Sequence, residues 1–139
     1  MKKILYLLTF VITLGLPSNL FAKEKVYDDT EFELVCRVVS AEARGECEDG
    51  QKAVVEVIKN RSELWDMTLT EVVTAKNQFA KPYKGEIPQS VKNAVVDVLY
   101  NDESVLDNEP VTHFHSGDKP YWTKDKTFVT QIENHYFYK

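Results

Sequence analysis

The chain has 139 residues, of which 22 are acidic and 17 basic, and its formal net charge is −5. This balance disfavours nucleic-acid binding, because neutralising phosphates requires an excess of lysine and arginine. It also disfavours long-range attraction to an anionic envelope, so recognition should be short-range. The sequence shows no internal repeat, low-complexity tract or interdomain linker, and its length predicts a single domain.

The first 22 residues have the pattern of a secretory signal peptide. Two lysines follow Met1, an almost unbroken apolar run covers residues 4–16, and Ala22 is a small residue of the kind that signal peptidases prefer. The run is too short to span a bilayer comfortably, and charged residues follow at once. An uncleaved anchor is the alternative. We expect a mature domain of residues 23–139, exported to the periplasm, cell wall or extracellular space, without stable membrane insertion.

The next part of the chain predicts helices. Thr30 and Glu33 have the spacing of a capping box, apolar residues then recur at helical intervals, and Gly45 is a natural stop. A second helix is expected from about Gly50 to Leu64.

Two further helices are expected after Leu64. Thr68 and Glu71 again have capping-box spacing and open a short helix that continues through Ala75. Residues 82–88 predict a loop, and Pro88 heads another helix that carries apolar residues as far as Leu99.

The C-terminal third changes in character. Residues 111–116 and 128–138 are rich in β-branched and aromatic side chains, and residues 116–120 have turn chemistry. Helices followed by strands predict an α+β domain, mainly helical with a small C-terminal β and aromatic region. A groove between the two parts is the expected place for a ligand.

One carboxylate lies on an apolar helix face. Phe32, Val35 and Val39 follow one another at helical spacing, and the next position on that stripe is Glu42. Burying an ionised carboxylate is expensive unless a cation lies nearby. Cleavage of a glycosidic bond requires a carboxylic acid that gives its proton to the leaving oxygen, so Glu42 is a candidate general acid.

Noncatalytic roles of Glu42 remain possible. Glu42 can pair with Arg37 or Arg44, or turn to solvent at the end of the helix. The acidic loop that follows contains Glu46, Glu48 and Asp49, any of which could be a second catalytic carboxylate, although acidic loop residues are usually only solvated. Glu46 is the preferred candidate of the three.

The chain contains two cysteines, Cys36 and Cys47. In an exported protein they can form a disulfide bond that encloses Glu42. The alternative is a buried Cys36 that packs as a small hydrophobic residue and a free Cys47, because sequence alone does not place the two Cα atoms within bonding range.

The run from Arg37 to Glu46, with Gly50-Gln51 and Asn60-Arg61 after it, resembles the opening motif of the SleB/CwlJ-type cell wall hydrolases. Gln78-Phe79 resembles the mid-domain motif of that family. Its closing signature is matched by the segment His113-Phe114-His115, by Pro120, Trp122, Thr130 and Ile132, and by the segment from His135 to Tyr138. The chain departs from the family at Glu133-Asn134, where a glycine usually precedes the histidine.

The resemblance implies a lysozyme-like or lytic-transglycosylase-like domain that cleaves peptidoglycan between N-acetylmuramic acid and N-acetylglucosamine. As a lytic transglycosylase it would need one carboxyl group, Glu42, to protonate the leaving oxygen and then to deprotonate the muramic C6 hydroxyl. A hydrolase would need a second carboxylate, for which Glu46 is the candidate. No cofactor is implied, and the expected partner is the glycan strand of peptidoglycan, bound by a monomer.

Aromatic side chains suit a sugar-binding groove. Phe79, Tyr121 and Trp122 are candidates for stacking on pyranose rings, with Gln78 as a hydrogen-bonding partner of an acetamido group and His115 beside them. Most tyrosines and phenylalanines nevertheless belong to cores or strand faces, which is the alternative for this set.

Two rival functions remain open from the sequence. A zinc amidase that cuts the muramoyl–L-alanine bond would take His113, His115 and His135 as ligands, although strand histidines near aromatic residues are more often hydrogen-bonded core residues. A noncatalytic wall-binding module or an inhibitor of host lysozymes would fit the small size and the export.

Overall fold

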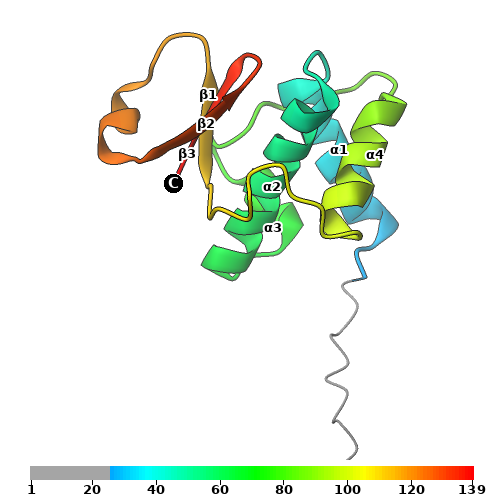
Figure 1. Ribbon diagram of the computed structural model, residues 1–139. Helices are drawn as coiled ribbons and strands as arrows, with labels where there is room; N and C mark the ends of the chain where they lie inside the picture. Colours follow the sequence, from blue (N-terminus) through cyan, green and yellow to red (C-terminus); the bar gives the residue numbers. More distant parts are fainter. Residues whose placement is uncertain (1–25) are drawn as a thin grey trace, which may run out of the picture.

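The computed structural model describes residues 26–139, and the expected signal peptide lies outside them. Four α-helices come first and three strands last, as the sequence predicts (Figure 1). The elements are α1 (Asp29–Ala43), α2 (Glu48–Trp65), α3 (Leu69–Thr74), α4 (Gln89–Leu99), β1 (His113–Ser116), the 3₁₀ helix η1 (Tyr121–Asp125), β2 (Phe128–Ile132) and β3 (His135–Tyr138). None of the helices in this part of the chain has the length and apolarity needed to cross a membrane.

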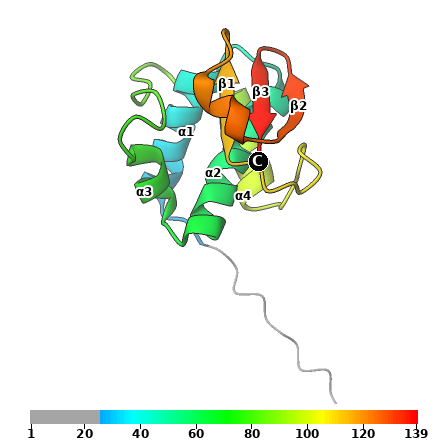
Figure 2. The same ribbon diagram turned by 90° about the vertical axis from the view of Figure 1, so that its left-hand side faces the viewer.

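Helix α2 is the centre of the fold. It contacts α1, α3, α4 and β1, and it lies between the sheet on one side and the α1–α4 pair on the other (Figure 1). Turned by 90°, the fold shows α1 and α3 on one side, the sheet on the other and α2 between them (Figure 2). The arrangement therefore joins a helical part and a small β part through one shared helix.

The helix starts follow local capping chemistry. The capping box at Thr68 and Glu71 is confirmed at the start of α3, where each residue bonds the backbone N–H of the other. The box expected at Thr30 is wrong. Asp28 caps α1 instead, because its carboxylate accepts the N–H of Glu31 at 2.8 Å two positions before the expected cap.

The core is built mainly from valines and other aliphatic side chains of the four helices. Removing each such side chain from water contributes about 1.5–3 kcal/mol, which makes the helix–helix contacts the main source of stability. The largest fully buried side chains are Phe137, Ile58, Leu106, Val35, Val38, Val39, Val54, Val55, Val57, Val72, Val91 and Val95.

Two buried charges on α2 hold the segment that joins α4 to β1. The ammonium of Lys52 lies 3.0 Å from Asp97 and 2.8 Å from Glu103. The carboxylate of Glu56 accepts the hydroxyl of Ser104 at 2.8 Å and the backbone N–H groups of Val105 and Leu106. These contacts fix a turn-rich segment that has no regular hydrogen bonding of its own.

The sheet is antiparallel, with strand order β1-β3-β2. The expected strand region 128–138 is two strands, because the chain turns at Glu133, whose φ of 46° is left-handed, and at Asn134. Side chains alternate across the sheet. The inner face contributes Phe114 and Phe137, whose ring centroids are 5.9 Å apart, to the contact with the helices.

Candidate active site

Glu42 lies in the last turn of α1, where the helical stripe predicts it, and its side chain is half-buried. Its Oε1 accepts the backbone N–H of Ala80 at 2.5 Å, which ties the segment between α3 and α4 to the end of α1. The carboxylate is thus held in place by a backbone donor from a segment 38 residues away along the chain.

Both arginine pairings considered for Glu42 are wrong. Arg37 donates to the carboxylate of Glu33 at 2.7 and 2.9 Å and to the carbonyl of Tyr83 at 3.0 Å. Arg44 donates to the carbonyl of Ser40 at 3.2 Å, and its guanidinium carbon lies 4.6 Å from the centroid of the Tyr83 ring. Neither Arg37 in α1 nor Arg44 at its C-cap therefore pairs with Glu42.

Arg61, on α2, is a cation close enough to Glu42 for the two charges to interact. Its Nε donates to the carbonyl of Thr112 at 2.6 Å, and one of its terminal nitrogens donates to Oε1 of Gln78 at 3.3 Å. Only 4% of Arg61 is exposed. Burial lowers the pKa of its guanidinium to about 10, while the nearby charge of Glu42 raises it. The two groups thus lie within electrostatic reach of each other.

Gln78 and Phe79, two of the expected substrate-binding residues, lie beside Glu42. They directly precede Ala80, which holds the carboxylate, and the guanidinium carbon of Arg61 lies 4.8 Å from the centroid of the Phe79 ring. Their place next to the acid is consistent with the prediction, and their contact with substrate stays a prediction.

Arg61 and Trp65 are not among the site residues expected from the sequence. The guanidinium carbon of Arg61 lies 5.2 Å from the Trp65 ring centroid, so the cation is packed between two aromatic rings, those of Trp65 and Phe79. Trp65 is 43% exposed, which leaves part of the indole open to a ligand. The i, i+4 spacing of Arg61 and Trp65 at the end of a predicted helix was the available signal.

His115 and Trp122 belong to an aromatic cluster on the outer face of the sheet. The Trp122 ring lies 5.9 Å from His115, 5.5 Å from His113 and 5.5 Å from Tyr138, measured between centroids. Tyr121, the fifth expected substrate-binding residue, is 85% exposed. Trp122 thus packs as part of a cluster, and the sugar contacts of all three residues stay predictions.

Glu46 is bound to the β2–β3 turn. Its Oε2 accepts the backbone N–H of Asn134 and its Oε1 accepts the side-chain amide of Asn134, both at 3.1 Å. Nδ1 of His135 lies 3.7 Å away, and the Glu46 side chain is only 11% exposed. Burial raises the pKa of Glu46, but the hydrogen bonds from Asn134 and the nearby His135 lower it by more, so the net shift is downward. Through these contacts Glu46 braces the turn, and its role as a second catalytic carboxylate stays a prediction.

The histidines considered as zinc ligands do not share one face of the sheet. His115 pairs with Tyr136 across the sheet, so His135, the neighbour of Tyr136, points to the opposite face from His115. His135 packs there against Phe114, at 5.3 Å between ring centroids. Within residues 26–139, no group of three His, Cys, Asp or Glu side chains is placed to hold a metal ion.

The cysteines follow the second alternative and form no disulfide bond. Cys36 is a buried thiol within α1, and Cys47 is an exposed thiol at the N-cap of α2. Burial raises the pKa of the Cys36 thiol to about 12, which keeps it protonated and unreactive.

A sequence profile that describes cell wall hydrolases matches residues 45–138, more than half of the chain. The chain belongs to the cell wall hydrolase family. It is therefore an enzyme that acts on the bacterial wall. The matched region begins just after Glu42, so the profile itself does not assign the acid. A comparison with curated proteins gives no match.

Two solved structures share the fold of this cell wall hydrolase. The catalytic domain of the Bacillus cereus SleB protein is 23% identical and superposes with a TM-score of 0.73, covering 83% of this chain and 94% of its own. The catalytic domain of the germination-specific lytic transglycosylase SleB from Bacillus anthracis is also 23% identical, with a TM-score of 0.72 over 81% of this chain and 97% of its own. At this identity the likeness establishes the α+β fold.

Proposed function

We propose that this cell wall hydrolase is a lytic transglycosylase that cleaves the bond between N-acetylmuramic acid and N-acetylglucosamine, with Glu42 as its acid and base. The observation that carries the proposal is the half-buried Glu42 carboxylate, which is held by the N–H of Ala80. The buried cation Arg61 lies within electrostatic reach of it. The fold is that of the Bacillus anthracis SleB domain, which is described as a lytic transglycosylase.

The reaction needs one carboxyl group that acts twice. Glu42 donates its proton to the glycosidic oxygen as the bond from that oxygen to the muramic C1 breaks. The carboxylate then takes the proton of the C6 hydroxyl, whose oxygen bonds to C1 and closes a 1,6-anhydro ring. Because Ala80 donates to Oε1, the second oxygen of Glu42 is the one left for proton transfer.

Arg61 supports the intermediate state of this cycle. After the first proton transfer the carboxylate of Glu42 is negative, and a buried cation nearby stabilises that charge more strongly than water-screened contacts would. The same guanidinium holds Gln78 and stacks on Phe79 and Trp65, so it also positions the side chains expected to meet the sugar.

The contacts of Glu46 favour transglycosylation over hydrolysis. A hydrolase needs a second carboxyl group, about 5 Å away in a retaining enzyme or about 6.5–9.5 Å away in an inverting one. Glu46 is the nearby candidate, and both of its oxygens already accept hydrogen bonds from Asn134. A carboxylate held in this way is a poor nucleophile and has little freedom to activate water.

The test is lysis of purified sacculi by the mature chain and by Glu42→Gln, with mass spectrometry of the released muropeptides. Loss of the acid and base should slow lysis by about 10²–10⁴-fold. Glu33→Gln is the matched control on the same helix, because Glu33 is exposed and its carboxylate pairs with Arg37 rather than with any group near Glu42. We expect this control to lyse like the parent.

The products separate the possible activities. Anhydro-muramic ends support transglycosylation, whereas reducing muramic ends indicate hydrolysis and freed stem peptides an amidase. Lysis that persists in Glu42→Gln would contradict the assignment of the acid, and lysis by neither protein would favour a binding module.

Action on the wall requires export, and we propose that residues 1–22 are the signal peptide that provides it. The mature enzyme would then be a monomer of residues 23–139. N-terminal sequencing of the exported protein should begin at Lys23, and its sedimentation in solution should give the mass of one chain. A retained N-terminus would instead indicate an anchor.

A further inference from the structure

The outer face of the sheet carries a pocket of about 340 Å³ that the proposed reaction does not use. It opens where the turn after β1 meets strands β2 and β3. We call it the outer aromatic pocket; its lining residues are His115, Gly117, Lys119, Phe128, Tyr136 and Tyr138. Its volume lies at the lower end of the range for small-molecule sites, about 300–1,000 Å³.

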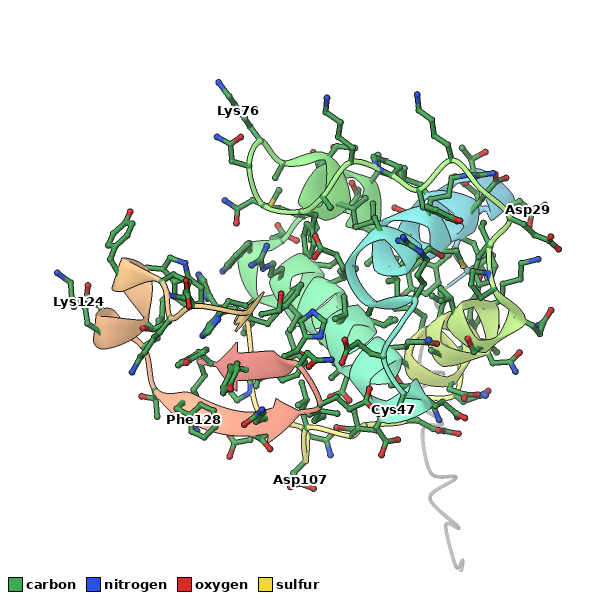
Figure 3. All side chains as sticks on the ribbon, turned by 90° about the horizontal axis from the view of Figure 1, so that it is seen from above. Asp29, Cys47, Lys76, Asp107, Lys124 and Phe128 are labelled. Carbon is green, nitrogen blue, oxygen red and sulfur yellow. The ribbon has the colours of Figure 1, made fainter. Side chains whose placement is uncertain are left out.

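This pocket is separate from the contact between sheet and helices. Phe114 and Phe137 fill the inner face, and Phe114 lies 6.3 Å from Phe79, the neighbour of the residue that holds Glu42. Phe128 lies on the outer face and is 53% exposed. Seen from above, Lys76, which is close in sequence to Gln78, lies at the top of the view, and Phe128 lies in its lower part (Figure 3). The outer aromatic pocket is therefore a second surface, distinct from the one around Glu42.

The walls of the pocket are held rigidly. His115 stacks on Tyr136 with 5.0 Å between centroids and 11° between planes, and on Tyr138 with 5.6 Å and 24°. Nε2 of His115 and the hydroxyl of Tyr138 lie 3.2 Å apart, and Trp122 packs edge-on against both rings. A ligand would meet aromatic surfaces that need little reordering on binding.

Phe128 completes the wall and is its most exposed ring. It meets Tyr138 edge-to-face, with centroids 5.6 Å apart and planes at 69°. About half of the Phe128 ring stays in water, whereas Tyr138 beside it is buried. Its exposed face is therefore available for contact with a ligand in the pocket.

We propose that the outer aromatic pocket binds an N-acetylated pyranose of the glycan strand, away from the bond that Glu42 cleaves. The C–H groups on one face of a pyranose pack against the electron-rich faces of aromatic rings, and Phe128 and Tyr136 supply such faces. Lys119 and the tyrosine hydroxyls are donors suited to hydroxyl and acetamido oxygens. No carboxylate lines the pocket, and one cation is too few to select the several carboxylates of a stem peptide.

This inference rests on the proposed function only in its choice of polymer. A glycan strand is long enough to occupy two sites on one enzyme, and the second contact then forms at high effective concentration. The pocket should therefore raise retention on the intact wall.

The experiment measures binding without turnover, using Glu42→Gln as the parent and co-sedimentation with purified sacculi. Adding Phe128→Ala should weaken binding about tenfold, because it removes a ring that stacks on the sugar. Adding Lys119→Ala should weaken binding about threefold, because it removes one polar contact. Tyr100→Ala and Lys124→Ala are the matched controls, because both residues are exposed and lie outside the pocket. Both controls should bind like the parent. Urea unfolding of each variant checks that its fold is retained.

Two further measurements locate the ligand. Sacculi stripped of stem peptides should bind the parent as well as intact sacculi do, and a chitin oligosaccharide should shift the amide NMR signals of Lys119, Phe128 and Tyr136. Three results would each overturn the proposal. Phe128→Ala could bind sacculi as well as its parent, binding could require the stem peptides, or the NMR shifts could be confined to residues 78–80. Failure of the proposed function would appear separately, as wild-type digests without anhydro ends while the pocket variants still lose binding.

Discussion

Replacing Glu46 with glutamine distinguishes a bracing carboxylate from a catalytic one. In the wild type, two donors of Asn134 reach the two oxygens of Glu46, each at 3.1 Å, and the side chain is 11% exposed. A glutamine keeps one acceptor and turns an N–H₂ group toward the other donor, which loses its partner. Leaving one such group unsatisfied costs about 1–3 kcal/mol. We therefore expect Glu46→Gln to be less stable by that amount and to keep its lytic rate within about threefold.

Urea unfolding at several pH values is the assay. The net pKa of Glu46 is lowered in the folded state, so its stabilising effect is present above the unfolded value, about 4.3, and is lost as the pH falls through the folded value. The stabilities of wild type and Glu46→Gln should therefore differ at pH 7 and converge below about pH 4. Asp49→Asn, which changes an exposed acid in the first turn of α2, is the matched control and should change stability by less than about 1 kcal/mol.

The opposite result would refute this reasoning. If Glu46→Gln unfolds like the wild type but lyses sacculi a hundredfold more slowly, Glu46 is a second catalytic carboxylate (about 10² is the lower range for removing a general base). The digest should then contain reducing ends, and the preference for transglycosylation would fail with it.

Three further predictions concern buried or half-buried side chains. Arg61→Lys keeps the charge but loses the planar guanidinium that donates to Thr112 and Gln78. The rate of lysis should fall about tenfold and the free energy of unfolding by about 1–3 kcal/mol. An unchanged rate of lysis would show that Arg61 does not position the site. Burial and the charges of Lys126 and Arg61 lower the pKa of His113 to about 4, so on acidification the unfolded chain takes up a proton before the folded chain does. The free energy of unfolding should therefore fall as the pH drops from about 6.5 to 4. Urea unfolding of His113→Asn should show a flatter dependence of stability on pH, and an equally steep one would contradict this. Lys52→Met should lose about 2–3 kcal/mol of stability in the same assay, because it leaves carboxylates without their cation, and a neutral result would show that these acids turn to water at no cost.

The sequence by itself determined the local elements. Helical periodicity and turn residues were enough for the order of helices and strands, because these signals act over a few neighbouring residues. Thr68 and Glu71 specified the start of α3, since both partners of a capping box lie within one turn. The capping-box spacing predicts the cap of α1 at Thr30, two positions too late, because the carboxylate of Asp28 accepts the N–H of Glu31 instead. The stripe that carries Glu42 was likewise readable from spacing alone.

Only the tertiary structure decided what these residues meet. The donor to Glu42 comes from 38 residues away and the donors to Glu46 from 88 residues away, and no periodicity links such positions. Strand register placed His115 and His135 on opposite faces, which a one-residue slip would reverse. Packing of whole elements sets these contacts, so the chemistry of each carboxylate became visible only once the helices and the sheet were in place.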